Sequence, residues 1–180
     1  MSFKRKWAVP AAAALALVLC ACSTPRVNSG VYLDADIQNT FGYCPSLEVD
    51  LVGVTEAEKK RLEAYNLDRY FSDDDEFRKS LGAVTFKFSS DDMTAKRLDR
   101  GSGCWDRWQD KGAVFLAALA NLPYTAGEGD DKSADPRRLV IDLNDGWLFN
   151  SRTHDIRVGM GGVIEIKNAP KVKTETVYAP

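Results

Sequence analysis

The chain has 180 residues, with 24 basic and 26 acidic side chains and a formal net charge of −2. This length suits a single domain, and a balance on the acidic side argues against a nucleic-acid partner. One histidine and four cysteines are too few for a zinc site once the cysteines are assigned as below.

The N-terminal segment has the pattern of a secretory signal peptide. Three basic residues, Lys4 to Lys6, precede an apolar run from Ala8 to Val18. This run is shorter than the roughly 20 residues that a membrane-spanning helix needs, so an uncleaved anchor is the less favoured alternative. The next four residues, Leu19-Cys20-Ala21-Cys22, resemble the lipobox of bacterial lipoproteins. Residues 1–21 are therefore predicted to be a cleaved signal, and Cys22 to be acylated.

Lipidation of Cys22 predicts where the protein resides. Several acyl chains on one residue hold a protein at a membrane far more firmly than a single chain does. Ser23 stands where, by the enterobacterial sorting rule that the segment resembles, an aspartate would indicate retention at the inner membrane. The sequence thus predicts an outer-membrane lipoprotein that faces the periplasm, with residues 22–30 as a lipidated tether.

Two cysteines remain for structural roles. Signal cleavage removes Cys20 and acylation occupies Cys22, which leaves Cys44 and Cys104 in an oxidising compartment. By elimination these two are expected to form a disulfide, which would stabilise the fold by roughly 4 kcal/mol in the chain-entropy model. Two free thiols are the alternative. Residues 22–180 retain 21 basic and 26 acidic side chains, a net charge of −5.

Alternating polarity marks the first two strands. Apolar and polar residues alternate from Val31 to Gln38, which is typical of a half-buried strand. Residues 39–45 are predicted to form a loop that carries Phe41 and Tyr43. A second strand follows, with Leu47, Val49 and Leu51 facing inward.

The next segment, residues 55–82, is predicted to be a helical insert. Thr55 and Glu58 have the spacing of a capping box, which places a helix from about Glu56 to Tyr65. Ser72 is expected to cap a second short helix. Phe77 and Leu81 would form its buried side, and Gly82 its end.

The remainder of the chain predicts mainly strands. Apolar and polar residues alternate from Val84 to Phe88, which predicts a strand. Residues 89–103 are polar, with one helical turn expected near Met93 to Leu98. Trp105 and Trp108 are three positions apart and are expected to share a helical face. The apolar run from Ala113 to Leu122 suits a central strand buried on both faces, with a helix as the alternative. Further strands are expected over residues 139–143 and in a hairpin around Gly161-Gly162, with at best one edge strand in the tail. Residues 31–180 are thus predicted to be one domain, an α+β, β-rich, two-layer antiparallel β-sandwich with a helical insert.

The sequence contains no catalytic motif that we can identify. His154 is the single histidine and is expected at the surface, and neither a Gly-x-Ser-x-Gly nor a Ser-x-x-Lys frame is present. The acidic runs near Asp73 and Glu128 lack the spacing of an EF-hand. We therefore expect no metal site and no cofactor. Three aromatic residues in expected loops, Phe41, Tyr43 and Tyr124, are candidate partner anchors, although they can equally fold back onto the core.

The order of elements resembles that of the TssJ lipoproteins of type VI secretion. The shared features are a lipidated cysteine, a short tether, a loop bearing Gly42, the strand Leu47–Val54, a helical insert, a buried strand ending at Leu122-Pro123, and closing hairpins. The resemblance implies a transthyretin-like sandwich at the outer membrane. It also implies that the loop between the first two strands, here Asn39 to Ser46, holds the periplasmic domain of the inner-membrane protein TssM.

These observations favour a non-enzymatic docking or assembly lipoprotein, with a TssM-like periplasmic protein as its partner and membrane lipid bound through Cys22. Two alternatives remain open. One is a small periplasmic hydrolase whose carboxylates converge only in the folded state. The other is an inhibitor or immunity lipoprotein, which would use exposed loops in the same way.

Overall fold

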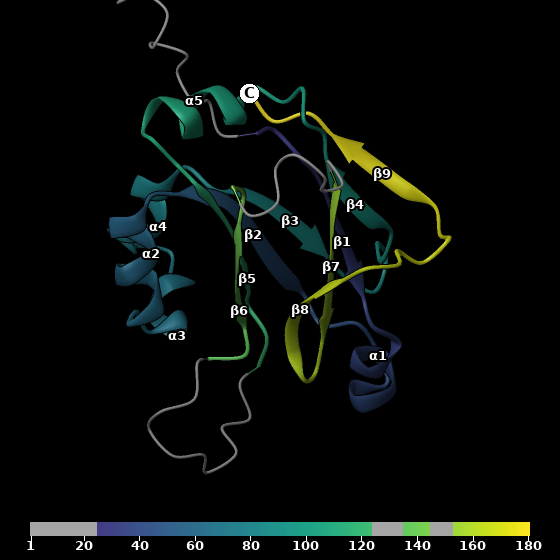
Figure 1. Ribbon diagram of the computed structural model, residues 1–180. Helices are drawn as coiled ribbons and strands as arrows, with labels where there is room; N and C mark the ends of the chain where they lie inside the picture. Colours follow the sequence, from purple (N-terminus) through teal and green to yellow (C-terminus); the bar gives the residue numbers. More distant parts are fainter. Residues whose placement is uncertain (1–24, 124–134, 145–152) are drawn as a thin grey trace, which may run out of the picture.

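Two β-sheets packed face to face form the body of the molecule in the computed structural model, which describes residues 25–123, 135–144 and 153–180 (Figure 1). The five-stranded sheet has the order β8-β7-β1-β4-β9, and the four-stranded sheet has the order β3-β2-β5-β6. The first contains β1 (Asn28–Leu33), β4 (Ala95–Leu98), β7 (Thr153–Gly159), β8 (Gly162–Ile166) and β9 (Thr174–Val177). The second contains β2 (Leu47–Val54), β3 (Val84–Phe88), β5 (Phe115–Ala120) and β6 (Arg138–Asp142). The β-rich, two-layer α+β architecture that the sequence predicts is confirmed.

The strand directions correct the expectation of a purely antiparallel sandwich. β1 runs parallel to β7, and β4 runs parallel to β9, whereas the other described pairs are antiparallel. The cause is connectivity. β8 and β9 form opposite edges of one sheet, so residues 167–173, which we call the strap, must cross that sheet before β9 can begin. A strand that arrives by a crossover is free to pair in parallel, unlike one that follows a tight hairpin.

The core is centred on β5. All six residues of this strand are buried, which confirms the prediction of a central strand with both faces covered and excludes the helical alternative. β5 pairs with β2 from Val49↔Ala120 to Val54↔Phe115. Its alanines let the layers on both sides approach closely, since a methyl group adds little thickness to a sheet.

The helical insert covers the outer face of the four-stranded sheet (Figure 1). It contains α2 (Glu56–Glu63), α3 (Leu67–Tyr70) and α4 (Glu76–Leu81). The capping box of α2 is confirmed, because the Thr55 amide donates to Glu58 at 2.8 Å and the Glu58 amide donates to the Thr55 hydroxyl at 3.2 Å.

Two details of the insert differ from expectation. Asp75, not Ser72, caps α4: its Oδ1 accepts from the Arg78 amide at 2.7 Å, whereas the Ser72 hydroxyl donates to a carbonyl oxygen of the preceding turn. The segment from Asn66 to Phe71, which has no periodicity in the sequence, contains the single turn α3. As predicted, Gly82 ends α4 in the left-handed conformation, with φ of 65°.

A buried carboxylate joins the insert to the sheet. Asp50 on β2 is completely shielded from solvent. Its two oxygens accept from the Thr85 hydroxyl at 2.6 Å, the Arg78 Nε at 2.8 Å and the Tyr70 hydroxyl at 3.0 Å. Arg78 also donates to Glu48 at 2.7 Å. Because a buried charge is tolerated only when it is paired and hydrogen-bonded, these contacts fix α3 and α4 over β2 and β3.

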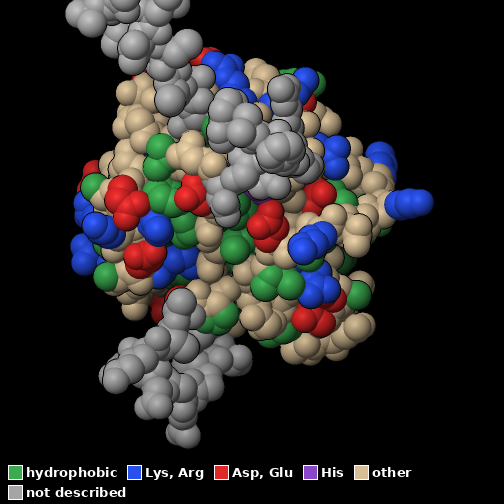
Figure 2. All heavy atoms as spheres, in the orientation of Figure 1, with side chains coloured by type: hydrophobic (Ala, Val, Ile, Leu, Met, Phe, Trp, Pro, Cys, Tyr) green, Lys and Arg blue, Asp and Glu red, His purple; other side chains and the backbone are tan. Residues whose placement is uncertain are grey.

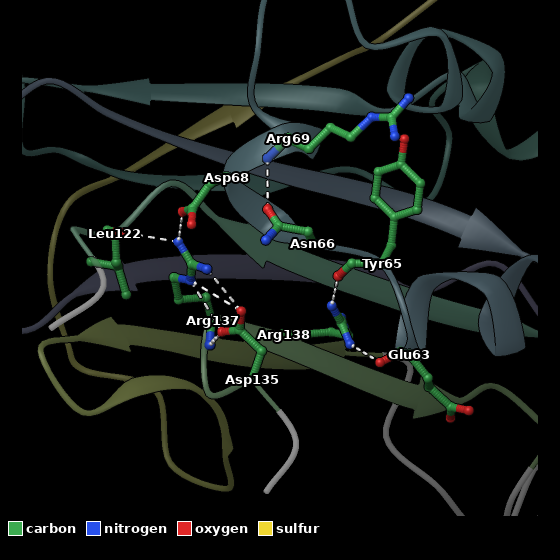
Figure 3. A network of polar contacts seen from close by, with 9 residues as sticks. All are labelled: Glu63, Tyr65, Asn66, Asp68, Arg69, Leu122, Asp135, Arg137 and Arg138. Carbon is green, nitrogen blue, oxygen red and sulfur yellow. Dashed lines mark hydrogen bonds and ion pairs between the residues drawn. The ribbon is translucent and has the colours of Figure 1, made fainter. Parts of the chain in front are cut away.

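A second set of polar contacts joins the insert to β6 (Figure 3). Arg138 donates to the carbonyl oxygens of Glu63 at 2.6 Å and Tyr65 at 2.7 Å, groups that the end of α2 leaves without helical partners. The neighbouring Arg137 pairs with Asp68 at 2.6 Å and with Asp135 at 2.8 Å. The insert is thus fastened at both edges of its sheet.

Two further elements differ from the sequence predictions, and one agrees with them. β1 begins at Asn28, so the last three residues of the predicted tether are strand. The helical turn expected near residues 93–98 is instead β4, which pairs with β1. The predicted helical face of the tryptophans is confirmed in α5 (Cys104–Asp110), where the rings of Trp105 and Trp108 meet edge to face at 4.9 Å between centroids.

The disulfide prediction is wrong for this structure, in which Cys44 and Cys104 are both buried free thiols. Cys44 lies beside the Leu47 end of β2, where its carbonyl oxygen accepts from Ser90 at 2.9 Å. Cys104 begins α5, which packs on the other end of β2 at Gly53. A strand of this length separates its ends by about 20 Å, far beyond the reach of a disulfide. Burial raises the pKa of both thiols, that of Cys104 to about 11.

Candidate docking surface

The segment expected to be a loop is largely a helix. α1 (Ala35–Phe41) begins where the Asp34 side chain accepts from the Asp36 amide at 3.1 Å, and it ends at Gly42 with φ of 73°. Residues 35–38 of the predicted strand and residues 39–41 of the predicted loop therefore belong to α1, with Asp34 as its N-cap. The alternation of polarity in the sequence continues past Leu33 by coincidence. The aspartate cap and the left-handed glycine determine the local structure instead.

Contacts with the β7–β8 hairpin hold α1 in place. The Asp34 amide donates to the Val158 carbonyl oxygen at 2.8 Å, and the Met160 amide donates to Asp36 at 3.0 Å. Arg157 lies 3.4 Å from the Asp34 carboxylate. These bonds, together with burial of Ile37, the one fully buried residue of α1, make α1 a fixed platform at one end of the sandwich.

The predicted anchors lie at the end of this platform but differ in exposure. Phe41, the last residue of α1, is half-buried and packs against the core. Tyr43 lies just beyond the helix and is 57% exposed. The two rings are tilted with their centroids 6.3 Å apart. Phe41 therefore packs beneath Tyr43, and Tyr43 is the more exposed of the two candidate anchors. Tyr124 lies outside the residues that the structure describes.

A groove of about 420 Å³ opens at the same end of the molecule. It lies between the end of β1, the segment leading into β4, and the strap; the lining residues are Tyr32, Leu33, Met93, Thr94, Ala95, Pro170, Val172 and Lys173. Leu33 immediately precedes the cap of α1, and Ser90 in the turn before Met93 contacts Cys44. One wall of the groove therefore leads directly into α1. Another wall follows the turn that contacts Cys44, the residue next to Tyr43.

The exposed side chains of α1 that precede the tyrosine are polar and uncharged, whereas those of the strap include cations. Gln38, Asn39 and Thr40 of α1 are exposed, and the strap adds the exposed cations Lys167, Lys171 and Lys173, for which no ion pair is found among the described residues. Figure 2 shows one face of the molecule, on which acidic and basic groups are interspersed with small apolar patches. We define the docking surface as α1 from Gln38, residues 42–46 and the groove.

No local pattern in the sequence indicates the groove, because its walls come from segments about 60 and 75 residues apart. The pairing of β1 with β4 brings two of them together, and the strap adds the third. The described residues contain no group of three potential metal ligands, and His154 pairs instead with Glu165 at 2.7 Å. No helix among the residues placed by the structure is long and apolar enough to span a membrane.

Comparison of folds identifies type VI secretion components as structural relatives. No protein-family model matches the chain, and no curated protein matches it significantly. The fold is similar to that of Serratia marcescens Lip, a membrane-bound component of the type VI secretion system, with a TM-score of 0.50 and 15% identity over 79% of this chain and 99% of Lip.

Two further structures belong to the same secretion system. A structure of the C-terminal domain of TssM from EAEC aligns with a TM-score of 0.52 and 11% identity, over 78% of this chain and 99% of that one. The lipoprotein TssJ1 of Pseudomonas aeruginosa aligns with a TM-score of 0.40 and 18% identity, over 81% and 100% of the two chains. At such low sequence identities, the similarity is limited to the fold. The predicted resemblance to type VI secretion lipoproteins is confirmed at that level.

Proposed function

We propose that this protein is an outer-membrane lipoprotein that docks a periplasmic partner in the membrane complex of a type VI secretion system. The observation that carries the proposal is the match to nearly the whole length of Lip, a membrane-bound component of that system. In this proposal the two layers are a transthyretin-like sandwich, residues 31–180 with β1 form one domain, and Cys22 holds the acyl chains.

The fold likeness alone does not choose between the two kinds of relative, since a TssM domain aligns as well as Lip does. The choice rests on the N-terminal residues Leu19-Cys20-Ala21-Cys22. A lipobox before the domain supports a lipidated protein that meets a TssM-like partner, rather than a domain of TssM itself.

The geometry of α1 and Tyr43 supports docking through them. A helix that is capped at both ends and bonded to β7 and β8 loses little conformational entropy when it binds. An exposed tyrosine combines a large apolar ring with a hydroxyl, and such residues are enriched among binding hot spots. The partner is expected to offer a pocket for Tyr43, with polar groups around it that match Gln38 and Asn39.

The test compares two tyrosines at opposite ends of the sandwich. Tyr43→Ala should weaken capture of the TssM-like periplasmic domain of the same organism by about 30-fold, which corresponds to about 2 kcal/mol for a hot-spot residue. Tyr178→Ala is the matched control, because Tyr178 is 70% exposed but lies next to α5. Both variants should melt within a few degrees of the natural protein, since exposed side chains contribute little to folding stability.

The possible outcomes separate the parts of the proposal. If neither variant changes the dissociation constant, the partner binds elsewhere on the molecule. If the natural protein captures no TssM-like domain in equilibrium measurements at micromolar concentrations, the docking function is wrong. Cys22→Ser tests the anchor separately: it should move the protein from the membrane fraction to the soluble periplasm, and its retention in membranes would contradict lipidation.

A further inference from the structure

Both ends of the described chain meet at α5. Arg26 pairs with Asp106 and donates to Gln109 at 3.3 Å, and both of these residues lie on α5. The other end of the chain reaches the same helix, where the Cys104 amide donates to the Ala179 carbonyl oxygen at 3.4 Å. Figure 1 shows the C-terminus beside α5 and α1 at the opposite end of the sandwich.

The length of chain between Arg26 and the acylated cysteine limits how far α5 can lie from the membrane. Cys22 precedes Arg26 by four positions, and an extended chain advances at most about 3.6 Å per residue. Arg26 is therefore within about 15 Å of the residue that carries the lipid. α1 lies farther away by the length of β1, about 20 Å for a strand of six residues.

The exposed side chains at the α5 end suit a lipid headgroup surface. Tyr178, Arg100 and Arg107 are all exposed, and each has an apolar stem or ring with a polar tip, the kind of side chain that is favoured at a membrane interface. Two contacts place them at the same end: the Asp99 amide, next to Arg100, donates to the Val177 carbonyl oxygen, next to Tyr178, and the Arg107 guanidinium donates to the Pro180 carbonyl oxygen.

The charge at this end is close to balanced. Asp106 is paired with Arg26, and Asp99 accepts from the Gly101 amide at 2.7 Å. Asp110 is exposed, with no ion pair to a described residue. A nearly neutral surface does not require anionic lipid, so zwitterionic phospholipid headgroups can lie against it. Attraction to the membrane then comes from the tether and not from net charge.

We propose that the α5 end of the sandwich lies against the phospholipid surface, with the Arg26–Asp106 pair holding the tether to α5, so that the docking surface points away from the membrane. This inference rests on the proposed lipidation of Cys22. It adds an orientation: the membrane contact is Arg100, Arg107 and Tyr178, and a periplasmic partner meets α1 at a distance from the lipid.

The experiment places a fluorophore at each end of the full-length lipidated protein in phosphatidylethanolamine–phosphatidylglycerol liposomes. Arg107→Cys labels α5, and Asn39→Cys labels α1 at an equally exposed position. The natural Cys44 and Cys104 are buried with raised pKa values, so they react slowly with maleimide. Nitroxide-bearing headgroup lipids should quench the label at 107 at least threefold more than the label at 39.

The outcomes distinguish orientation from anchoring. Protein that fails to float with the liposomes overturns the lipid anchor and the orientation together. Protein that floats but shows equal quenching at the two positions, or stronger quenching at 39, overturns the orientation alone. Arg26→Ala should reduce the difference between the labels, and Arg26→Lys should preserve it, since only the charged side chain pairs with Asp106. Identical behaviour of the two variants would exclude Arg26 as the residue that holds the tether.

Discussion

The outer faces of the two sheets are covered in different ways. The four-stranded sheet lies under three helices that are bonded to it through Asp50, which is fully buried. Among the described residues, the strap is the segment that crosses the five-stranded sheet. There Tyr32 lies flat over Gly30, its hydroxyl 3.1 Å from Asp155, and accepts a hydrogen bond from Arg97 at 3.2 Å. The Asp50 carboxylate is completely shielded from solvent, whereas the Asp155 and Arg97 side chains are 14% and 35% exposed. We infer that the helix-covered face supplies rigidity, while the other leaves room for a groove.

The largest effect is expected from removing the buried carboxylate. Asp50→Ala should lower the free energy of unfolding by about 3–5 kcal/mol, because Arg78 and Tyr70 lose their shared partner in the dry interior. Asp155→Ala removes a comparable pair of contacts from the five-stranded sheet and should cost only about 1 kcal/mol. Urea unfolding measures both. Equal costs would show that the two faces do not differ as argued.

Replacing one strand glycine in each sheet should show the same difference in stability on a smaller scale. A methyl group on Gly53 would lie 2.7 Å from Trp108 Cβ, an atom next to the helix backbone, so Gly53→Ala must displace α5 and should cost about 2 kcal/mol. On Gly30 the methyl would meet the side-chain ends of Asp155 and Tyr32, which can move. Gly30→Ala should therefore cost about half as much. A larger loss for Gly30→Ala in thermal unfolding would reverse the comparison.

Acid should act first on the helix-covered sheet. The hydrogen bond from Arg78 holds the pKa of Glu48 below its ordinary value of 4.5. The stability that this pair contributes is complete above that pH and is lost as the pH falls through the lowered pKa. Glu48→Gln should therefore make the free energy of unfolding less dependent on pH below about 4.5. Asp92→Asn is the control: Lys96 also lowers the pKa of Asp92, but that carboxylate is at an exposed edge and is screened by solvent.

The smallest effect is expected from reductant. Because Cys44 and Cys104 are free and lie at opposite ends of β2, dithiothreitol should leave the melting temperature unchanged. Mass spectrometry of unreduced, denatured protein should find both thiols alkylated. A shift in melting temperature, or a peptide joining Cys44 to Cys104, would contradict the structure. It would mean that a disulfide contributes to the difference in stability between the two sheets.

Local signals in the sequence were sufficient for much of the fold. The alternation in β3, the capping box at Thr55 and the apolar run of β5 each depend on residues within one element, and the structure agrees with all three. Where two local signals compete, the weaker pattern misleads. At residues 34–41 the alternation suggests a strand, but the Asp34 cap and Gly42 produce α1.

Features that depend on distance in space were beyond the sequence. Counting cysteines gives a pair but not the separation between them, so the disulfide was predicted wrongly. The polar segment that contains β4 has too little periodicity to reveal a strand that is stabilised by β1 and β9 on either side. Of the candidate anchors, Tyr43 is exposed and Phe41 is half-buried. How far an aromatic side chain is exposed depends on how the element that carries it packs, and the sequence does not show that packing.

The position of β1 affects when the five-stranded sheet can fold. This strand comes first among the described elements but lies in the middle of its sheet, between β4 and β7. Asn28 pairs with Thr153, 125 positions farther along. Such remote pairings slow folding to milliseconds or seconds, because a long loop must close before its contacts form. The sheet remains incomplete until nearly the whole polypeptide is available. The export that we propose for this chain would benefit from the delay, because the sheet cannot close before its last strands are available.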